Sequence, residues 1–119
     1  MAAMTCNVAR LDDRDDDERL HRWRSEHDPA EVIRHLCSWV KTRRRWEFAG
    51  EPPGVDRLEV HLLHRTRLFR FTDDVFLSLS PDGGGAVVDA VSRSRIGKGD
   101  LGQNRRNLLD LRRGIVGVG

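Results

Sequence analysis

The stretch VFLSLSPDGGGAVVDAVSRS, residues 75–94, decides the fold class of this chain. Apolar residues at positions 75, 77 and 79 alternate with Phe76 and two serines, which is the period-two pattern of a strand. A second alternating run begins at Ala86. Between the two runs, PDGGG supplies glycines that adopt positive φ without strain and so close a hairpin. The second strand is predicted to place Val87, Asp89, Val91 and Arg93 on one face, and Ala86, Val88, Ala90 and Ser92 on the other.

Two more strands are predicted before this hairpin. RWEFAG, residues 45–50, alternates until a glycine and two prolines interrupt the pattern. A longer strand starts near Arg57, and Leu63 shifts its apolar phase as a β-bulge would. TDD, residues 72–74, predicts a tight turn into the hairpin.

A helix is predicted on each side of the strands. Asp28 is a suitable cap for the first helix, Pro29 suits its first position, and Glu31 completes the spacing of a capping box. KTRRR, residues 41–45, places positive charge at the C-terminal end, where the helix dipole favours it. The apolar stripe of this helix consists of Val32, Ile33, Leu36, Trp39 and Val40.

The second helix follows the last strand. Asp100 is its expected cap, Gln103 stands at its third position, and Gly97 and Gly99 form a flexible exit from the strand. Its buried stripe is expected to consist of Leu101, Leu108, Leu111 and Ile115.

The order of these elements predicts an α+β domain. A helix, a four-stranded antiparallel meander and a C-terminal helix form two layers, with the helices on one sheet face. Residues 1–27 lack clean periodicity and predict a charged N-terminal arm that packs loosely, so the domain is expected to occupy residues 28–119. The total of 119 residues suits one domain.

The charge of the chain is nearly balanced. Lys and Arg number 21 and Asp and Glu number 19, which gives a net charge of +2 and does not favour nucleic acid as a partner. Residues 12–18 are acidic, whereas residues 41–45 and 93–113 are basic. The acidic run is expected to be solvated or to fold back on the basic faces; mimicry of a polyanion is the alternative.

Targeting and cysteine signals are few. Cys6 and Cys37 match no zinc or redox spacing, and Cys37 is expected to be a buried thiol. The chain shows no secretory signal and no apolar run long enough to cross a bilayer, so we expect a cytoplasmic protein without a membrane partner.

Two segments carry a family resemblance. RTRLFRFTDDV, residues 65–75, contains an R-L-F-x-F-x-D-D pattern, and SRSRIGKGDLGQN, residues 92–104, contains an S-R-S-R-x-G-x-x-D-L-G-x-N pattern. In this order and spacing they resemble the bacterial and plastid family known as domain of unknown function 1499. TCNV, residues 5–8, is a remnant of the cysteine-containing start of many relatives. The resemblance implies a fold, but no activity, ligand or partner.

The basic segment after the last strand matches no nucleotide motif. No Ser or Thr follows Lys98 as a Walker loop requires, and the segment closes an antiparallel meander instead of opening a βαβ unit. The amides at the start of the last helix, with cations near them, suggest an anion site. Its candidate residues are Arg67, Arg93, Arg95, Lys98 and Arg105. The alternative is a capped helix whose arginines pair within the chain. Asn104, which belongs to the matched motif, is part of this helix.

Asp73 and Asp74 allow two interpretations. Paired carboxylates can share a proton or bind a hard cation, which would suit a metal-assisted or acid/base hydrolase together with His64. Alternatively, one aspartate accepts backbone amides and the other pairs with Arg93 or Arg95, which is the arrangement we predict. His61 and His64 are expected on opposite faces of their strand, so no two-histidine metal site is predicted.

These observations favour a binding or accessory module without catalytic residues, metal or cofactor. Its expected ligand is a small anion or an acidic protein segment, held near the candidate arginines, with Asp73 and Asp74 orienting them. The alternatives are the hydrolase that uses Asp73 and Asp74, and a weak nucleic-acid binder with an arginine-rich sheet face.

Overall fold

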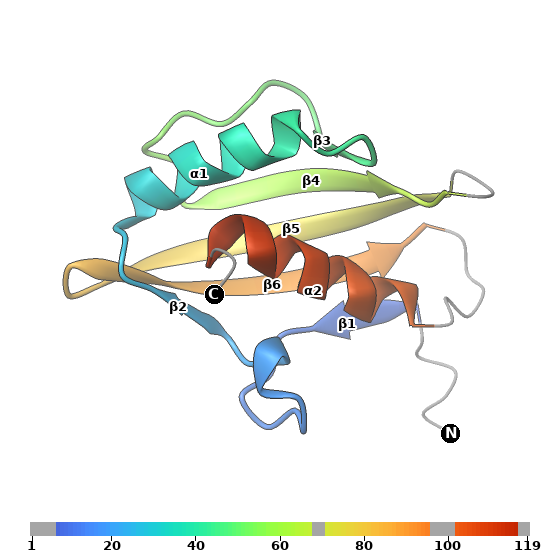
Figure 1. Ribbon diagram of the computed structural model, residues 1–119, viewed down its shortest axis with the longest axis horizontal. Coiled ribbons are helices and arrows are strands. Elements are labelled where there is room, and N and C mark those ends of the chain that lie inside the picture. The colour runs from blue at the N-terminus through green and yellow to red at the C-terminus, as the bar shows by residue number, and fades with distance from the viewer. Residues whose placement is uncertain (1–6, 68–70, 96–101, 117–119) are drawn as a thin grey trace.

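The computed structural model describes residues 7–67, 71–95 and 102–116. Their elements follow one another as β1 (Val8–Arg10), the 3-10 helix η2 (Glu18–Leu20), β2 (Trp23–Ser25), α1 (Pro29–Lys41), β3 (Trp46–Phe48), β4 (Glu59–Arg65), β5 (Thr72–Asp82), β6 (Gly85–Ser94) and α2 (Gln103–Ile115) (Figure 1). The protein therefore has the expected α+β class, with two α-helices and an antiparallel sheet.

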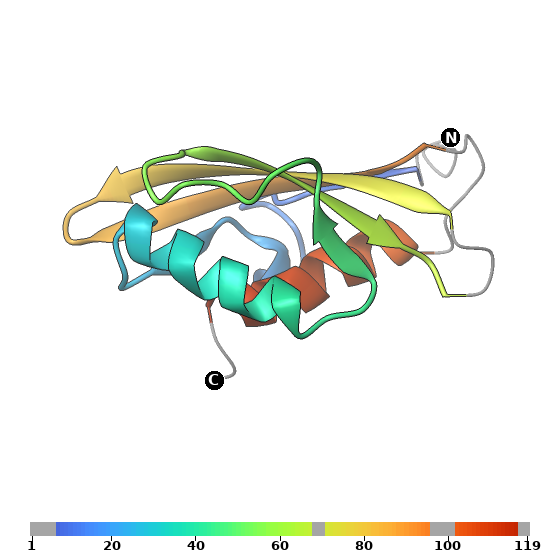
Figure 2. The ribbon, with the colours of Figure 1, turned by 90° about the horizontal axis from the view of Figure 1, so that it is seen from above.

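The sheet has six strands, so the predicted sheet of four strands is wrong. The strand order is β1-β6-β5-β4-β3, and β2 also pairs with β6, farther along that strand. Because β1 and β2 are only three residues long, they are too short to show a period-two pattern in the sequence. Both α-helices lie on the same face of the sheet (Figure 2). No helix among the described residues is long and apolar enough to cross a membrane.

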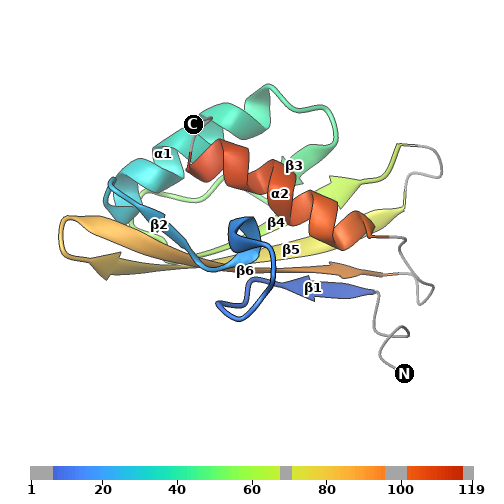
Figure 3. The ribbon, with the colours of Figure 1, turned by 60° about the horizontal axis from the view of Figure 1, so that its bottom comes forward.

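Residues 7–27 contribute side chains to the core, so the expectation of a loosely packed arm is wrong for the described part of this segment. Leu11, Leu20 and Trp23 are at most 6% exposed. β1 runs beside β6 at the sheet edge, and η2 lies next to α2 (Figure 3). The acidic run folds back as one interpretation proposed, because Asp15 pairs with Arg105 at 3.0 Å.

The first helix starts as predicted. The Asp28 carboxylate accepts a hydrogen bond from the Glu31 amide at 2.9 Å, and Pro29 occupies the first turn. The second helix starts later than expected, because Gly102 at φ 83° is its N-cap residue and makes no side-chain cap. The remaining predictions for this connection, which concern Gly97, Lys98, Gly99, Asp100 and Leu101, lie outside the described residues.

The strands pair without the expected irregularities. β4 pairs with β5 in unbroken register from Glu59 opposite Ser78 to Arg65 opposite Thr72, so the predicted bulge at Leu63 is wrong. Residues 72–74 are also not a tight turn but the first residues of β5. The unbroken register keeps Val60, Leu62 and His64 on the helix-facing side and His61 on the other, as predicted for the two histidines.

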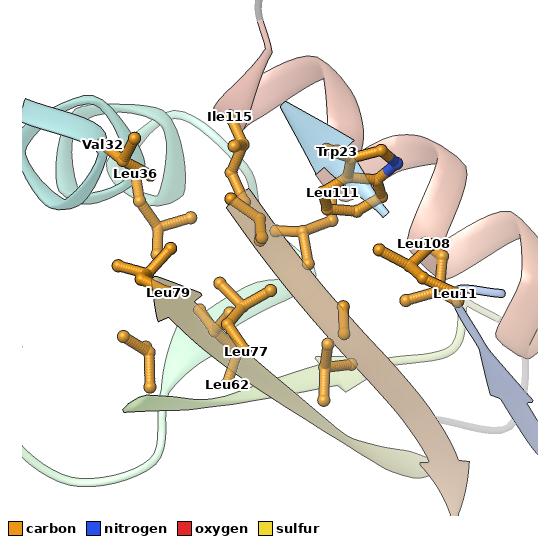
Figure 4. Close-up of a cluster of buried hydrophobic side chains, with 14 of the residues drawn as sticks. Leu11, Trp23, Val32, Leu36, Leu62, Leu77, Leu79, Leu108, Leu111 and Ile115 are labelled. Carbon is orange, nitrogen blue, oxygen red and sulfur yellow. The ribbon is translucent and has the colours of Figure 1, made fainter. Parts of the chain in front are cut away.

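The core lies between the sheet and the two helices. Figure 4 shows Leu62, Leu77 and Leu79 of the sheet facing Leu36 of α1 and Leu111 of α2. Leu108 and Ile115 of the predicted α2 stripe are also buried. Two polar residues of α2, Asn104 and Asn107, are equally buried. The sheet face that carries neither α-helix is called the open face below; its side chains include His61, Asp74, Phe76 and Arg93.

Candidate functional site

Arginines gather at the end of the sheet where β4 ends and β3 begins. A cavity of about 550 Å³ is lined there by Arg44, Arg45, Arg65, Thr66 and Arg67. We call it the arginine cavity. Among the described residues, four of the five that line it carry a guanidinium group and none carries a carboxylate. This composition favours an anion as occupant, because guanidinium groups bind phosphates and carboxylates through paired hydrogen bonds.

The local fold explains why these arginines meet. α1 ends at Lys41, and the hydroxyl of Thr42 donates to the carbonyl of Trp39, which turns the chain toward β3. The first residue of β3, Trp46, pairs with His64 near the end of β4. The amide of Arg65 then donates to the carbonyl of Arg45 at 2.9 Å. The antiparallel pairing therefore brings the sequences RRR, residues 43–45, and RTR, residues 65–67, to one place.

The positive charge of the arginine cavity is only partly neutralised. Arg65 donates to Glu47 at 2.7 Å, and both side chains are about half exposed. Arg44, Arg45 and Arg67 are exposed and form no ion pair with any residue that the structure describes. Guanidinium groups around one space repel one another, and an anion between them would relieve this repulsion.

A smaller cavity of about 210 Å³ adjoins the first, and we call it the histidine cavity. It shares Arg44 and Arg45 with the arginine cavity, and its other lining residues are Thr42, Arg43, Trp46, His64 and Asp110. The Asp110 carboxylate is already occupied, because it accepts hydrogen bonds from Arg43 at 2.9 Å and from Trp46 Nε1 at 2.8 Å.

A buried network, which we call the asparagine clasp, ties α2 to the sheet behind these cavities. Ser92 donates to Asn104 Oδ1 at 2.6 Å, and Asn104 Nδ2 donates to Ser94 Oγ and to the carbonyl of Asn7. Asn107 Nδ2 donates to Asp73 at 2.8 Å. Both segments of the family resemblance contribute to the clasp. Because Ser92, Asn104 and Asn107 are at most 1% exposed, its role is structural.

Asp74 forms the predicted ion pair. Arg95 donates to both of its carboxylate oxygens, at 2.9 and 3.0 Å, and His61 Nε2 lies 2.8 Å from Oδ1. Asp73 and Asp74 point to opposite faces of β5, since Asp73 is 2% exposed on the helix side. The structure therefore does not unite Asp73, Asp74 and His64 in one pocket. No group of three or more His, Cys, Asp or Glu residues in the described ranges is placed to hold a metal ion.

The sequence-predicted cations do not form one site. Arg67 lines the arginine cavity, whereas Arg93 lies exposed on the open face. Arg95 and Arg105 are paired with Asp74 and Asp15, as the alternative interpretation of the basic segment expected. Lys98 is outside the described residues.

Three arginines that line the cavity, Arg44, Arg45 and Arg65, were not among the predicted candidate residues. In the sequence, Arg44 and Arg45 belong to the basic run at the end of the first helix, and Arg65 belongs to the first segment of the family resemblance. A usable signal was present, because two arginine-rich runs flank the ends of adjacent antiparallel strands that must meet.

The Asp74 pair predicts a dependence of stability on pH. Hydrogen bonding from Arg95, with His61 contributing, holds the pKa of Asp74 below its ordinary value of 3.8. Since the folded-state pKa is the lower one, the ionised carboxylate stabilises the fold above pH 3.8, and this contribution is lost as the pH falls further. Asp74→Asn is therefore expected to reduce the acid-induced loss of unfolding free energy by up to about 1 kcal/mol, measured by urea titration at several pH values. An identical acid profile for both proteins would contradict this assignment.

Comparisons with known proteins identify the family. The chain matches no curated protein. Among solved structures, it is similar to TTHA0849 from Thermus thermophilus, with 14% sequence identity, a TM-score of 0.36, and coverage of 81% of this chain and 86% of that one. The model of the family described as protein of unknown function (DUF1499) matches residues 3–115. The match extends the resemblance of the two motifs to nearly the whole sequence, and the chain belongs to the DUF1499 family.

Proposed function

We propose that this protein is a binding or accessory module that holds an anion with closely spaced acidic groups in the arginine cavity. The observation that carries the proposal is the lining of that cavity, to which the described part of the chain contributes four arginines and no carboxylate. Its volume of about 550 Å³ lies within the range of small-molecule sites, about 300–1,000 Å³. A single phosphate group would leave much of this space empty, so a ligand with two or more acidic groups fits better.

The polar groups at the cavity wall support the same ligand class. Arg65 is held in place by Glu47, which leaves further N–H groups of its guanidinium to donate. The hydroxyl oxygen of Thr66 accepts a hydrogen bond from the Phe71 amide at 2.9 Å, so its proton is available to an anion. Phosphate groups of a small molecule and carboxylates of an acidic protein segment present the same chemistry to these donors.

The arginine cavity can be tested by calorimetry. Inorganic pyrophosphate and a hexaglutamate peptide are titrated separately into the wild type, Arg67→Ala and Arg44→Ala. Each substitution is expected to weaken binding about tenfold or more, because a hydrogen bond to a charged group contributes about 1.5–3 kcal/mol. The relative affinities of the two probes distinguish a small-molecule ligand from a protein segment.

Arg93→Ala is the matched control, because Arg93 is also an exposed arginine but lies on the open face. It should bind the probes like the wild type. The proposal is contradicted if neither probe binds, or if Arg93→Ala weakens binding while Arg67→Ala does not. It is also contradicted if a single-stranded oligonucleotide binds more tightly than both probes with a steep dependence on salt, which would favour the nucleic-acid alternative.

A further inference from the structure

We infer that His64 is a ligand of the same anion site and that anion binding takes up a proton on its imidazole ring. The inference rests on the proposed function, which it extends to the histidine cavity. It concerns a side chain that the sequence suggested only as a hydrolase residue.

The imidazole ring of His64 is buried and lacks a hydrogen-bond partner at Nδ1. The residue is 6% exposed. The nearest carboxylate oxygen, Oδ2 of Asp73, lies 3.8 Å from Nδ1. Nε2 makes no hydrogen bond with a described residue either, but it is not sealed from solvent, and His64 lines the histidine cavity. The ring therefore borders a space that an anion can enter.

The arginine cavity and the histidine cavity share two lining residues. Arg44 and Arg45 line both of them, so an anion held by these arginines lies next to the cavity that ends at His64. The histidine cavity has a volume of about 210 Å³, enough for one acidic group beyond those in the arginine cavity.

Charged side chains from three parts of the fold surround the ring of His64. Oδ2 of Asp73 in β5 lies 3.8 Å from Nδ1 of His64. Asn107 of α2, which donates a hydrogen bond to Asp73, is uncharged. Asp110 of α2 is engaged by Arg43 and by Trp46, whose ring centroid is 4.9 Å from that of His64. The charged groups that oppose protonation are Arg43, Arg44 and Arg45 of the loop between α1 and β3.

These charges couple protonation to binding. With an anion present, a protonated His64 has a negative group near each nitrogen, Asp73 at Nδ1 and the ligand at Nε2, and donates to the ligand. Because the bound state favours the protonated ring, affinity is expected to be high at low pH and to fall as the pH rises through the range in which histidines ionise, about 6–7.

Calorimetry with ethane-1,2-disulfonate tests the inference, because its strong-acid groups keep their charge throughout this range. The wild type, His64→Gln and His61→Gln are compared at about pH 5.5 and about pH 8 in buffers of different ionisation enthalpy. The wild type should bind at least about fivefold more weakly at the higher pH and take up a proton on binding. His64→Gln should lose both effects, whereas His61→Gln, on the open face, should keep them.

The outcomes separate the inference from the proposed function. No binding at either pH contradicts the proposed function itself. Binding that requires Arg67 but has no pH dependence, or a pH dependence that survives in His64→Gln, overturns only the role of His64. If His64→Gln does not fold, the imidazole signals of the wild-type protein decide: the His64 titration midpoint should rise on saturation with the disulfonate, and an unchanged midpoint overturns the inference.

Discussion

Asn107→Leu is expected to lower the free energy of unfolding by about 3–5 kcal/mol, because it leaves the buried carboxylate of Asp73 without its donor. Asp73 is 2% exposed, and the amide of Asn107 is the only hydrogen-bond donor to its side chain among the described residues. Leucine has the same branched shape as asparagine and a higher helix propensity, so loss of the donor dominates the effect. Urea denaturation followed by circular dichroism measures the change.

A double-mutant cycle with Asp73→Asn provides the control for this prediction. Asparagine removes the negative charge, so Asp73→Asn/Asn107→Leu should be destabilised by less than the sum of the two single variants. Arg113→Gln, an exposed substitution on the same helix, should change stability by less than about 0.5 kcal/mol. Additive effects of the two clasp substitutions would show that the Asn107–Asp73 contact does not hold α2 on the sheet.

Trp23→Ala is expected to cost about 3–5 kcal/mol, as for other large residues removed from a core. Trp23 is 3% exposed and belongs to the same buried cluster as Leu111 of α2 (Figure 4). Its Nε1 atom also donates to the carbonyl of Arg19 at 2.9 Å, which fastens η2 to β2. The effect is measured by the same urea titration, and a loss of this size would show that residues before α1 are part of the folding unit.

Arg24→Ala is the matched control on the same strand. Arg24 is exposed and pairs with Asp82 at 3.2 Å, and such surface ion pairs contribute about 1 kcal/mol or less. The prediction is contradicted if Trp23→Ala unfolds at the same urea concentration as Arg24→Ala, since the N-terminal segment would then be dispensable for stability.

Features that depend on neighbours in the sequence could be predicted. The hairpin was predicted over residues 75–94 from alternation and a glycine turn, although β5 begins three residues earlier, and the start of α1 follows from Asp28, Pro29 and Glu31. The Arg95–Asp74 pair was also within reach, because two adjacent strands place the partners near each other. In contrast, the two strands of the N-terminal segment are specified by the partner β6 and not by their own periodicity.

The candidate site could be predicted only in part. The sequence indicated an arginine-based anion site and included Arg67, but it grouped Arg67 with Arg95 and Arg105, which bind carboxylates of the protein itself. The partner of Arg105 is Asp15, which is 90 residues away in the chain. No local pattern indicates an ion pair over such a distance.

By itself, the sequence determined the α+β class, the central hairpin, the first helix and the membership of the DUF1499 family, because periodicity, capping and motif spacing are local properties of the chain. Only the tertiary structure decided which arginines are neutralised and which line a cavity. An ion pair forms wherever folding brings a carboxylate within a few ångströms, and this distance is set by strand register and helix packing. For the same physical reason, Asp73 and Asp74 became a buried clasp residue and a surface partner of Arg95, on opposite faces of one strand.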